Sequence, residues 1–380
     1  MNEERKNFFK SLPKNLTYDP VEVVKIGDRL VGKGQPVFII AEASANHRGK
    51  LENALKMIEL AAGAGADVIK FQHLTHDKIA ADTTIYDKQS EKPIGTLSDF
   101  YRSAEMPPEW TKKLIAHAKK HNIMFLSSPF DKEAVDELDA AGVPAFKVAS
   151  YELTDDILLR HIAQKGKPII LSTGMAYLEE VAHAVRVIQE EGNNKIILLH
   201  CISIYPPKSF ADLNLRAIKT LSEAFKIPVG YSDHSKPPYL AAPITAVALG
   251  ACVIEKHFTT DQKGGSNDDL NSLEIEDFRR TVLEIRNAEQ ALSMIGIKQP
   301  ISNKAHESGS DEIADRWARR SLYAAQDIPA GTYLNENLIL TLRPWGGITP
   351  KDAGLVIGKK VLRFIPARSA ITWADFLETK

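Results

Sequence analysis

Residues 123–150 read IMFLSSPFDKEAVDELDAAGVPAFKVAS, and this stretch decides the fold. It holds a short apolar run (Ile123–Ser127), a segment of helical period (Glu133–Ala141), then Gly142 and a second apolar run (Ala145–Ala149). Runs this short and uniformly apolar are typical of parallel strands buried on both faces. A glycine directly after a helical segment is typical of a helix C-terminus. The stretch therefore predicts a strand, a helix and a second, parallel strand.

The same unit recurs from residue 37 to about residue 296. The other apolar runs are Val37–Ala41, Asp67–Phe71, Pro168–Ser172, Lys195–His200, Pro228–Tyr231 and Val253–Lys256. Helical segments lie between them, and Gly65, Gly192 and Gly250 each precede the next run. Eight β-then-α units close a TIM barrel, whereas a doubly wound sheet more often stops at about five or six strands. We therefore predict an α/β fold with a (β/α)8 barrel over residues 37–297.

The barrel leaves part of the chain over, because a (β/α)8 barrel takes about 250 residues and this chain has 380. Residues 1–36 form an N-terminal extension before the first run. The polar stretch at 298–313 (KQPISNKAHESGSDEI) predicts an interdomain linker. Residues 314–380 then predict a small β-rich domain with an internal pseudo-repeat, DIPAGTYLNENL at 327–338 and FIPARSAITWADF at 364–376.

One connection inside the barrel is unusually long. From His73 to Pro108 the chain runs through a mostly polar segment before the next helix. A connection of this length in a compact domain is usually functional, so we expect a lid or a wall of the substrate site here.

Composition excludes several classes of protein. The net charge of −1 argues against a nucleic-acid-coating protein, which needs a surplus of Lys and Arg. Two cysteines, Cys201 and Cys252, are too few for a disulfide framework, and we expect both to be buried. The N-terminus lacks the apolar core of a signal peptide, and no apolar run reaches membrane-spanning length. We expect a cytoplasmic protein with no membrane or nucleic-acid partner.

Polar side chains gather where the predicted strands end. The active site of a (β/α)8 barrel lies at the C-terminal ends of its strands. The residues at those ends are Glu42, Asn46, His47, Lys70, Gln72, Ser127, Ser128, Lys147, Ser150, Ser172, Thr173, His200, Tyr205, Ser232, Asp233, His234 and His257. Because burying so many polar groups is unfavourable without a purpose, this ring predicts a functional site.

Lys70 and Lys147 each interrupt an apolar strand, and a buried ammonium needs a counter-charge. Three interpretations are open: an ion pair with Glu42 or another barrel carboxylate, a bound phosphate or carboxylate, or a Schiff-base lysine. The neighbouring serines favour a cradle for a small, multiply charged anion.

His234 (YSDHS) and His257 (IEKHF) end consecutive strands, so their imidazoles can converge. With Glu42 and Asp268 nearby they predict a mixed nitrogen and oxygen site for a divalent metal such as Mn²⁺, Fe²⁺ or Zn²⁺. Such an ion can act as a Lewis acid on a carbonyl oxygen.

The motifs IIAEASANHRG, ADVIKFQ, FLSSPFD, VPAFKVASYE, ILSTGM, LLHCISIYP, GYSDHS and IEKHFTTD occur in that order, and the tail carries LRPWGGI. The chain thereby resembles the sialic acid synthase family over about residues 25–380, including the C-terminal SAF (antifreeze-like) domain. That family condenses phosphoenolpyruvate with an N-acetylated hexosamine, giving a nonulosonic acid and phosphate by C–O cleavage. It uses a divalent metal, Mn²⁺ foremost, with Mg²⁺ or Co²⁺ as alternatives.

The resemblance also implies roles for individual residues. It implies phosphoenolpyruvate binding by Lys70, Ser128, Lys147, Ser150, Ser172 and Ser232, metal binding by His234 and His257, and sugar binding by Gln72, Tyr205, Asp268 and Arg343. Glu42, Lys70, Lys147 and Asp268 are the implied catalytic residues, with Glu42 positioning or deprotonating the attacking water. Arg343 would reach the sugar in a neighbouring subunit, which implies a homodimer with swapped C-terminal domains.

Two departures from the family pattern leave the sugar open. No clear equivalent of the family's sugar-binding Asn lies between Glu91 and Ser98, and a Gly-Pro turn is missing before Asp268. N-acetylmannosamine, a 2,4-diacetamido-trideoxyhexose (a legionaminic- or pseudaminic-type product) and a spore-coat-type sugar all fit. Two rival functions are a catalytically dead, carbohydrate-binding barrel and a Schiff-base aldolase acting through Lys147.

Overall fold

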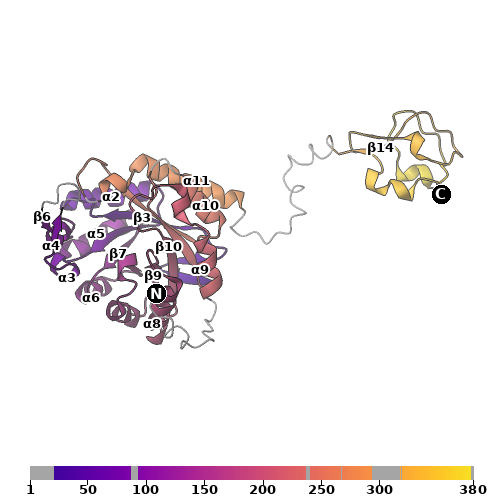
Figure 1. Ribbon diagram of the computed structural model, residues 1–380. Helices are drawn as coiled ribbons and strands as arrows, with labels where there is room; N and C mark the ends of the chain where they lie inside the picture. The colour runs from indigo at the N-terminus through magenta and orange to yellow at the C-terminus, as the bar shows by residue number, and fades with distance from the viewer. Residues whose placement is uncertain are drawn as a thin grey trace. The chain divides into compact units, whose positions relative to one another are not determined.

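The computed structural model describes residues 21–86, 93–236, 240–266, 268–292, 317 and 319–377. The chain divides into two compact units, residues 1–297 and residues 298–380 (Figure 1). The predicted linker at 298–313 lies outside the described residues.

The first unit is the predicted (β/α)8 barrel. Its parallel strands are β3 (Phe38–Ser44), β4 (Val68–His73), β7 (Met124–Pro129), β8 (Phe146–Val148), β9 (Ile169–Ser172), β10 (Ile196–Cys201), β11 (Val229–Asp233) and β12 (Val253–Thr259). They pair in the order β7-β4-β3-β12-β11-β10-β9-β8. β7 and β8 lie next to each other and bring the two ends of this order together. A two-residue strand, β13 (Leu273–Glu274), extends the pairing of β12.

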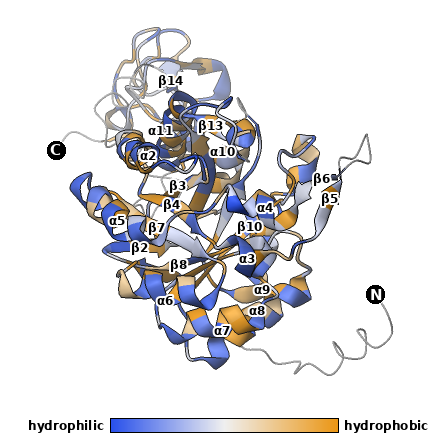
Figure 2. Ribbon diagram, turned by 90° about the vertical axis from the view of Figure 1, so that its left-hand side faces the viewer, coloured by the Kyte–Doolittle hydropathy of each residue, from blue (hydrophilic) through white to orange (hydrophobic). Residues whose placement is uncertain are grey.

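Eight helices surround these strands, as the alternating sequence pattern predicts. They are α2 (Leu51–Gly63), α5 (Thr111–Lys120), α6 (Lys132–Ala140), α7 (Asp156–Gln164), α8 (Leu178–Glu190), α9 (Ala217–Phe225), α10 (Ala241–Ala248) and α11 (Ile275–Ala291). Side chains alternate along each strand. In β3, Ile39 and Ala41 pack toward the helices, whereas Phe38 and Ile40 join a separate core cluster. Figure 2 shows hydrophobic strands at the centre of this unit, surrounded by helices that mix hydrophilic and hydrophobic residues.

An N-terminal hairpin that the sequence analysis did not anticipate precedes the barrel. β1 (Val23–Ile26) and β2 (Arg29–Gly32) pair antiparallel. Val24, Ile26 and Val31 are buried in one core cluster with residues near the beginnings of the barrel strands, such as Phe38 and Val253. The hairpin therefore closes the barrel at the end opposite to the predicted site.

The long connection after β4 contains several short elements. It contains α3 (His76–Ile79), an antiparallel hairpin of β5 (Thr84–Tyr86) and β6 (Pro93–Thr96), α4 (Leu97–Arg102) and a short 3-10 helix, η1 (Pro108–Trp110). Leu74, Ile79, Phe100, Tyr101 and Ala104 from this connection line the cavity described below. The connection thus forms one wall of this cavity, and its described part contains short helices and a hairpin.

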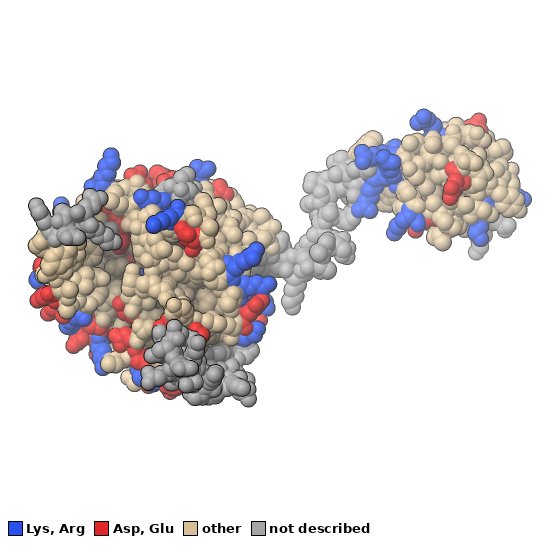
Figure 3. All heavy atoms as spheres, viewed as in Figure 1, with Lys and Arg blue, Asp and Glu red and all other residues tan. Residues whose placement is uncertain are grey.

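Short 3-10 helices complete the first unit. They are η2 (Ser150–Glu152), η3 (Phe210–Leu213) and η4 (Asp269–Asn271). η2 follows β8 after one residue, and η4 lies in the connection after β12, so both lie at the end where the site is predicted. None of the described helices is long and apolar enough to cross a membrane. Figure 3 shows Lys, Arg, Asp and Glu interspersed over the visible face of this unit.

The second unit is a small domain with its own core. Its elements are β14 (Ser321–Ala324), β15 (Ile339–Leu342) and the 3-10 helices η5 (Glu336–Leu338), η6 (Pro350–Leu355) and η7 (Trp373–Phe376). The two phrases of the pseudo-repeat pair with each other, since the backbone N–H groups of Ile328 and Ile365 each donate to the other's carbonyl at 2.9 Å. Each phrase ends in a capped 3-10 helix, with Asn335 or Thr372 as the N-cap.

Candidate active site

A cavity of about 360 Å³ lies where the barrel strands end. It is lined by every barrel residue for which the family resemblance implies a role: Glu42, Lys70, Gln72, Ser128, Lys147, Ser150, Ser172, Tyr205, Ser232, His234, His257 and Asp268. These residues come from all eight strands or the loops that follow them. The barrel topology thus brings together residues that are up to 226 positions apart, from Glu42 to Asp268.

The two lysines lie at the base of this cavity, 4% and 2% exposed. Lys70 forms an ion pair with Glu42 and donates to Ser128 Oγ at 3.3 Å. Lys147 donates to Ser172 Oγ at 2.7 Å. The expected ion pair with Glu42 is therefore present, and the expected hydroxyl groups accompany it.

Glu255 is the second carboxylate of this cluster, and the sequence analysis missed it. Its Oε1 lies 3.6 Å from Lys147 Nζ, and its Oε2 lies 3.7 Å from Lys70 Nζ. Ser232 donates to Glu255 Oε1 at 2.8 Å. Glu255 stands two residues before His257 in a strand, so the period of two alone places both side chains on the same face.

Burial and neighbouring charges shift the pKa values of this cluster in opposite directions. Burial raises the pKa of Glu42 to about 7, against the attraction of Lys70. Burial also opposes ionisation of Glu255, but Lys147 and Lys70 hold the pKa of its carboxyl at about 2. Burial lowers the pKa of the Lys147 ammonium, which Glu255 only partly offsets. The site therefore holds two ammonium groups whose charges are largely compensated before any ligand binds.

The backbone at Gly174 passes close to the side chain of Ser150. The backbone N–H of Gly174 donates to Ser150 Oγ at 3.0 Å. A Cβ at residue 174 would lie 2.2 Å from Ser203 Oγ and 2.8 Å from Ser150 Oγ, so only glycine fits there. This contact fixes the hydroxyl of Ser150 at the rim of the lysine cluster.

The two histidines converge in the same cavity. Their ring centroids lie 5.3 Å apart, and the Tyr205 ring lies 3.9 Å from that of His234. Nδ1 of His234 lies 2.8 Å from the carbonyl of Ile202, which leaves Nε2 available to a ligand. Nδ1 of His257 is buried and has no partner among the described residues. A buried imidazole nitrogen without a protein partner, in a ring 5.3 Å from a second imidazole, fits a bound divalent metal ion.

Within the part of the chain that the structure describes, no third protein ligand is preassembled at this pair. Among the described residues, the group of three whose ligand atoms lie within 4.8 Å of one another is Glu59, His117 and His121. These residues belong to α2, α5 and the position just after α5, on the outer layer of helices. The predicted metal pair and this outer group are therefore separate features.

The remaining wall of the cavity combines apolar and polar groups that sequence analysis did not select. Leu74, Ile79, Phe100, Ala104 and Phe130 form its apolar part. Tyr101, Tyr151 and Glu152 also line the cavity. Burial raises the pKa of Glu152 to about 7, and its Oε2 has no hydrogen-bond partner in the described structure.

Other strand-end residues turn away from the cavity and have structural partners. His47 packs edge-on against Trp110, and burial lowers its pKa to about 4. Asp233 is paired with Lys256 at 2.8 Å, and His200 Nε2 lies 2.8 Å from the carbonyl of Leu213. The remaining three, Asn46, Ser127 and Thr173, bond to backbone carbonyls.

The two cysteines are buried, as expected. Cys252 lies near the closed end of the barrel, in the core cluster of the N-terminal hairpin. Cys201 lines the cavity instead, with its Sγ 3.8 Å from His234 Nδ1.

Arg343 belongs to the second unit, where it is exposed beside the exposed Trp345. The loop that carries both residues is fixed by hydrogen bonds. Ser321 Oγ accepts from the backbone N–H groups of Gly346 and Gly347, each at 3.1 Å, and Tyr323 Oη donates to the carbonyl of Pro344 at 2.9 Å.

Comparisons with known proteins agree with this arrangement. The NeuB family model matches residues 57–296, and the SAF domain model matches residues 319–377. The pseudaminic acid synthase of Campylobacter jejuni (strain 81-176) is 40% identical over 346 residues, covering 90% of this chain and 96% of that protein. The N,N'-diacetyllegionaminic acid synthase of C. jejuni (strain NCTC 11168) is 41% identical, covering 84% of this chain and 94% of that protein.

A solved structure supports the same assignment. The N-acetylneuraminic acid synthetase of Leptospira borgpetersenii, in complex with citrate, is 34% identical with a TM-score of 0.66, covering 78% of this chain and 97% of that one. A (β/α)8 barrel with this ring of strand-end residues, the two matching domain models and relatives of this similarity lead to one conclusion. The chain belongs to the NeuB family, with a C-terminal SAF domain.

Proposed function

We propose that this chain condenses phosphoenolpyruvate with an N-acetylated hexosamine to give a nonulosonic acid and inorganic phosphate. The observation that carries the proposal is the meeting of buried Lys70 and Lys147 with serine hydroxyls in the same cavity as His234 and His257. The named relatives are synthases of nonulosonic acids, which supports the same reaction type.

The lysine cluster suits phosphoenolpyruvate because that substrate carries a phosphate and a carboxylate. Lys70 with Ser128 offers one set of hydrogen-bond donors, and Lys147 with Ser172 offers a second. Charge-assisted donors of this kind bind phosphate and carboxylate oxygens strongly. Ser150 and Ser232 line the same cavity and would complete the cradle.

The charge balance of the cavity supports a divalent cation as well. Glu42 and Glu255 already compensate the two lysines, so a polyanionic substrate needs further positive charge. His234 and His257 would hold the ion, with Mn²⁺ as the best fit and Mg²⁺ or Co²⁺ as alternatives. When bound, such an ion would supply a Lewis acid for the aldehyde oxygen of the open-chain sugar.

The chain's own residues would orient the reactants. C3 of phosphoenolpyruvate forms a bond to the aldehyde carbon, water adds at C2, and the C2–O bond to phosphate breaks. Glu42 is the group that would position and deprotonate the water, since its Oε1 is buried and free of hydrogen bonds in the described structure. Gln72, Tyr205 and Asp268 would hold the sugar, and the lysines would neutralise the departing phosphate.

The apolar wall favours one class of sugar. Leu74, Ile79, Phe100, Ala104 and Phe130 offer no hydrogen bond to a hydroxyl group, whereas a 6-deoxy sugar presents a methyl group. Two relatives at 40–41% identity are pseudaminic and legionaminic acid synthases. A 2,4-diacetamido-2,4,6-trideoxyhexose is therefore the second candidate substrate beside N-acetylmannosamine.

A homodimer with exchanged C-terminal domains would complete the site. The barrel's open end carries exposed apolar side chains, Tyr151, Met175, Tyr177 and Phe210, which are 49–69% exposed. Arg343 and Trp345 are exposed on a rigid loop of the second unit. Apolar patches of this kind on a monomer are typical of interaction surfaces. Arg343 would reach the sugar's N-acyl group from the partner.

Phosphate release from phosphoenolpyruvate tests the function directly. The purified chain, Mn²⁺ and a panel containing N-acetylmannosamine and 2,4-diacetamido-trideoxyhexoses should release phosphate with at least one sugar, and mass spectrometry of the product identifies which. No turnover with any sugar, despite metal binding, would support the dead-barrel alternative.

The low pKa of Lys147 also fits a Schiff-base lysine, so the aldolase alternative needs its own test. Borohydride treatment with pyruvate should leave the chain's mass unchanged. A trapped adduct on Lys147 would overturn the synthase proposal.

A further inference from the structure

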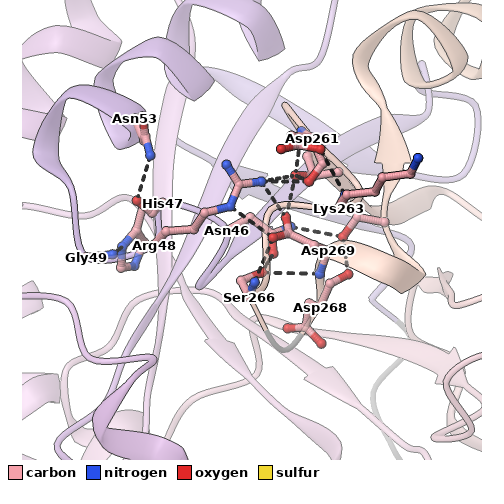
Figure 4. Close-up of polar contacts among 12 residues, drawn as sticks. Asn46, His47, Arg48, Gly49, Asn53, Asp261, Lys263, Ser266, Asp268 and Asp269 are labelled. Atoms are coloured by element: carbon pink, nitrogen blue, oxygen red, sulfur yellow. Dashed lines mark hydrogen bonds and ion pairs between the residues drawn. The ribbon is translucent and has the colours of Figure 1, made fainter.

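Arg48 lies just outside the cavity and makes an unusually complete set of contacts with the loop after β12. Its Nε and Nη2 atoms each lie 3.0 Å from a carboxylate oxygen of Asp269, and Nη2 donates to the carbonyl of Asp261 at 2.7 Å. Figure 4 shows the guanidinium lying among Asp261, Asp269 and Ser266. Two parallel bonds of this kind fix the carboxylate's orientation as well as its position.

Asp269 also bonds to Thr259 at the end of β12 and to Ser266 within the loop. Its side chain is fully buried. Oδ1 accepts from Thr259 Oγ1 at 2.5 Å, at the end of β12, and Oδ2 accepts from the backbone N–H of Ser266 at 2.8 Å. One carboxylate, held by Arg48, therefore links Thr259 at the end of the strand to Ser266 in the loop.

Two further observations show that the contact is built into the backbone. Arg48 has φ of +52°, a left-handed conformation that is unfavourable for a residue with a Cβ. A Cβ at residue 264 would lie 2.0 Å from the Arg48 Cζ, so Gly264 allows the loop to pass directly over the guanidinium. The contact therefore requires an unfavourable backbone conformation at Arg48 and a residue without a side chain at position 264.

The opposite side of the loop carries Asp268. Its carboxylate points away from Arg48 in Figure 4 and lines the cavity. Ser44 donates to its Oδ2, and Ser272 Oγ donates to its carbonyl oxygen at 2.7 Å. Asp268 and Asp269 thus face opposite ways from adjacent positions, one toward the cavity and one toward Arg48.

We propose that Arg48 is a positioning residue that fixes the 261–272 loop through Asp269 and thereby holds Asp268 at the sugar side of the cavity. The inference rests on the proposed function, because sugar kinetics supply its readout. It assigns Arg48 and Asp269 to sugar recognition without contact with the sugar. Lys70 and Lys147 donate to Ser128, Ser172 and the carbonyl of Val148, and among the described residues neither lysine has a hydrogen bond to Arg48 or Asp269.

Steady-state kinetics of Arg48→Met and Asp269→Asn test this assignment. Both variants should lower kcat/KM for the sugar at least about tenfold while the KM for phosphoenolpyruvate changes less than about twofold. If Arg48 and Asp269 act through one contact, the double variant should lose about as much sugar kcat/KM as either single variant. Two independent effects on the loop would instead add in the double variant. Arg48→Lys keeps the charge without the planar fork and should recover only part of the loss.

Arg29→Met is the control, because Arg29 also forms an ion pair with an aspartate, Asp67, but at the closed end of the barrel. It should lower stability but leave the sugar kinetics unchanged. Hydrogen exchange should also rise in residues 261–272 of Arg48→Met and not of Arg29→Met.

The outcomes separate the two proposals. An active wild-type enzyme with unchanged sugar kcat/KM in Arg48→Met and Asp269→Asn would overturn the role of Arg48 alone. Equal effects on the sugar and phosphoenolpyruvate KM would overturn it too.

A wild-type chain that turns over no sugar refutes the proposed function. In that case unchanged hydrogen exchange of the loop in Arg48→Met would overturn the positioning, and increased exchange would support it. If Arg48→Met does not fold, Arg48→Lys and Asp269→Asn carry the same comparison.

Discussion

Lys147 and Glu255 form an ion pair inside the barrel: Nζ lies 3.6 Å from Oε1, and the two side chains are only 2% and 5% exposed. Lys70 lies 3.7 Å from the other oxygen of the same carboxylate. Glu255 therefore serves as a shared counter-ion for the two lysines that are proposed to bind an anion. A ligand with acidic groups would compete with it for the same charges.

Glu255→Gln should accordingly destabilise the free protein and make it more responsive to anions. Removing one partner of a buried ion pair should lower the free energy of unfolding by about 3 kcal/mol. Phosphoenolpyruvate or inorganic phosphate should then raise the Tm more in the variant than in the wild type, because the anion replaces the missing carboxylate. Calorimetry with and without each anion measures both effects.

The exposed Glu274→Gln provides the control for Glu255→Gln, and neither quantity should change in it. A Glu255→Gln protein of wild-type stability, or one with no larger anion response, would show that the lysines do not depend on Glu255.

Much of this site follows from local sequence rules. The period-two pattern of each strand and the barrel rule select Lys70, Lys147 and His257 by position alone, and all three line the cavity. The same rule places Glu255 on the face of His257, but the sequence analysis selected only the residue at the end of this strand. In the fold Lys256 faces the other way and pairs with Asp233.

Other features depend on contacts between distant parts of the chain, which a single sequence does not encode locally. The hairpin at Val23–Gly32 is stabilised by core residues from several barrel strands. The partnership of Arg48 and Asp269 joins residues 221 positions apart. Nor does strand periodicity distinguish a strand-end residue that lines the cavity, such as Ser128, from one that bonds to backbone, such as Ser127.

Glu152→Gln should change how stability depends on pH. Burial raises the pKa of Glu152 to about 7, so the folded state holds this proton more tightly than the unfolded state does. The contribution to stability is full below the unfolded pKa of about 4.5 and is lost as pH rises through about 7. The variant should therefore gain stability relative to the wild type between pH 5 and pH 8, by at most about 3 kcal/mol.

Urea unfolding at pH 5 and pH 8 measures this difference. Glu179→Gln, which replaces an exposed glutamate on α8, should show no pH-dependent gain. A gain for Glu152→Gln at pH 5 that equals the gain at pH 8 would show that Glu152 ionises normally in the folded protein.

His257→Ala should abolish Mn²⁺ binding and phosphate release together. Nδ1 of His257 has no protein partner in the described structure, so its removal should cost little stability. The matched control is His121→Ala, which removes one ligand atom from the outer group of Glu59, His117 and His121. Titration calorimetry with Mn²⁺ should show tight binding in His121→Ala and none in His257→Ala. Tight Mn²⁺ binding in His257→Ala and none in His121→Ala would show that the metal ion binds at Glu59, His117 and His121 on the outer helices instead.

Arg343→Ala should raise the sugar KM at least about tenfold and leave the phosphoenolpyruvate KM within about twofold. The guanidinium is proposed to reach the sugar of the partner subunit, and the loss of a charged hydrogen-bond donor has this magnitude. Arg368→Ala, at another exposed arginine of the same unit, is the control. Mixing an Arg343→Ala chain with an inactive His257→Ala chain should restore sites that carry both intact residues. Failure of such mixtures to gain activity would argue against the exchanged domain.

The hairpin at the closed end should contribute strongly to stability without affecting binding. Ile26 is fully buried against the starts of the barrel strands, whereas Leu30 of the same hairpin is 46% exposed. Ile26→Ala should therefore lower the free energy of unfolding by about 2–5 kcal/mol, and Leu30→Ala by less than about 0.5 kcal/mol. Because the cavity lies at the other end of the barrel, the phosphoenolpyruvate KM of the folded Ile26→Ala protein should match the wild type.

Urea unfolding measures the free energy of unfolding, and initial rates measure the phosphoenolpyruvate KM. A small effect of Ile26→Ala on unfolding would mean that the barrel is stable without its hairpin, and a raised KM would mean that the two ends of the barrel are coupled.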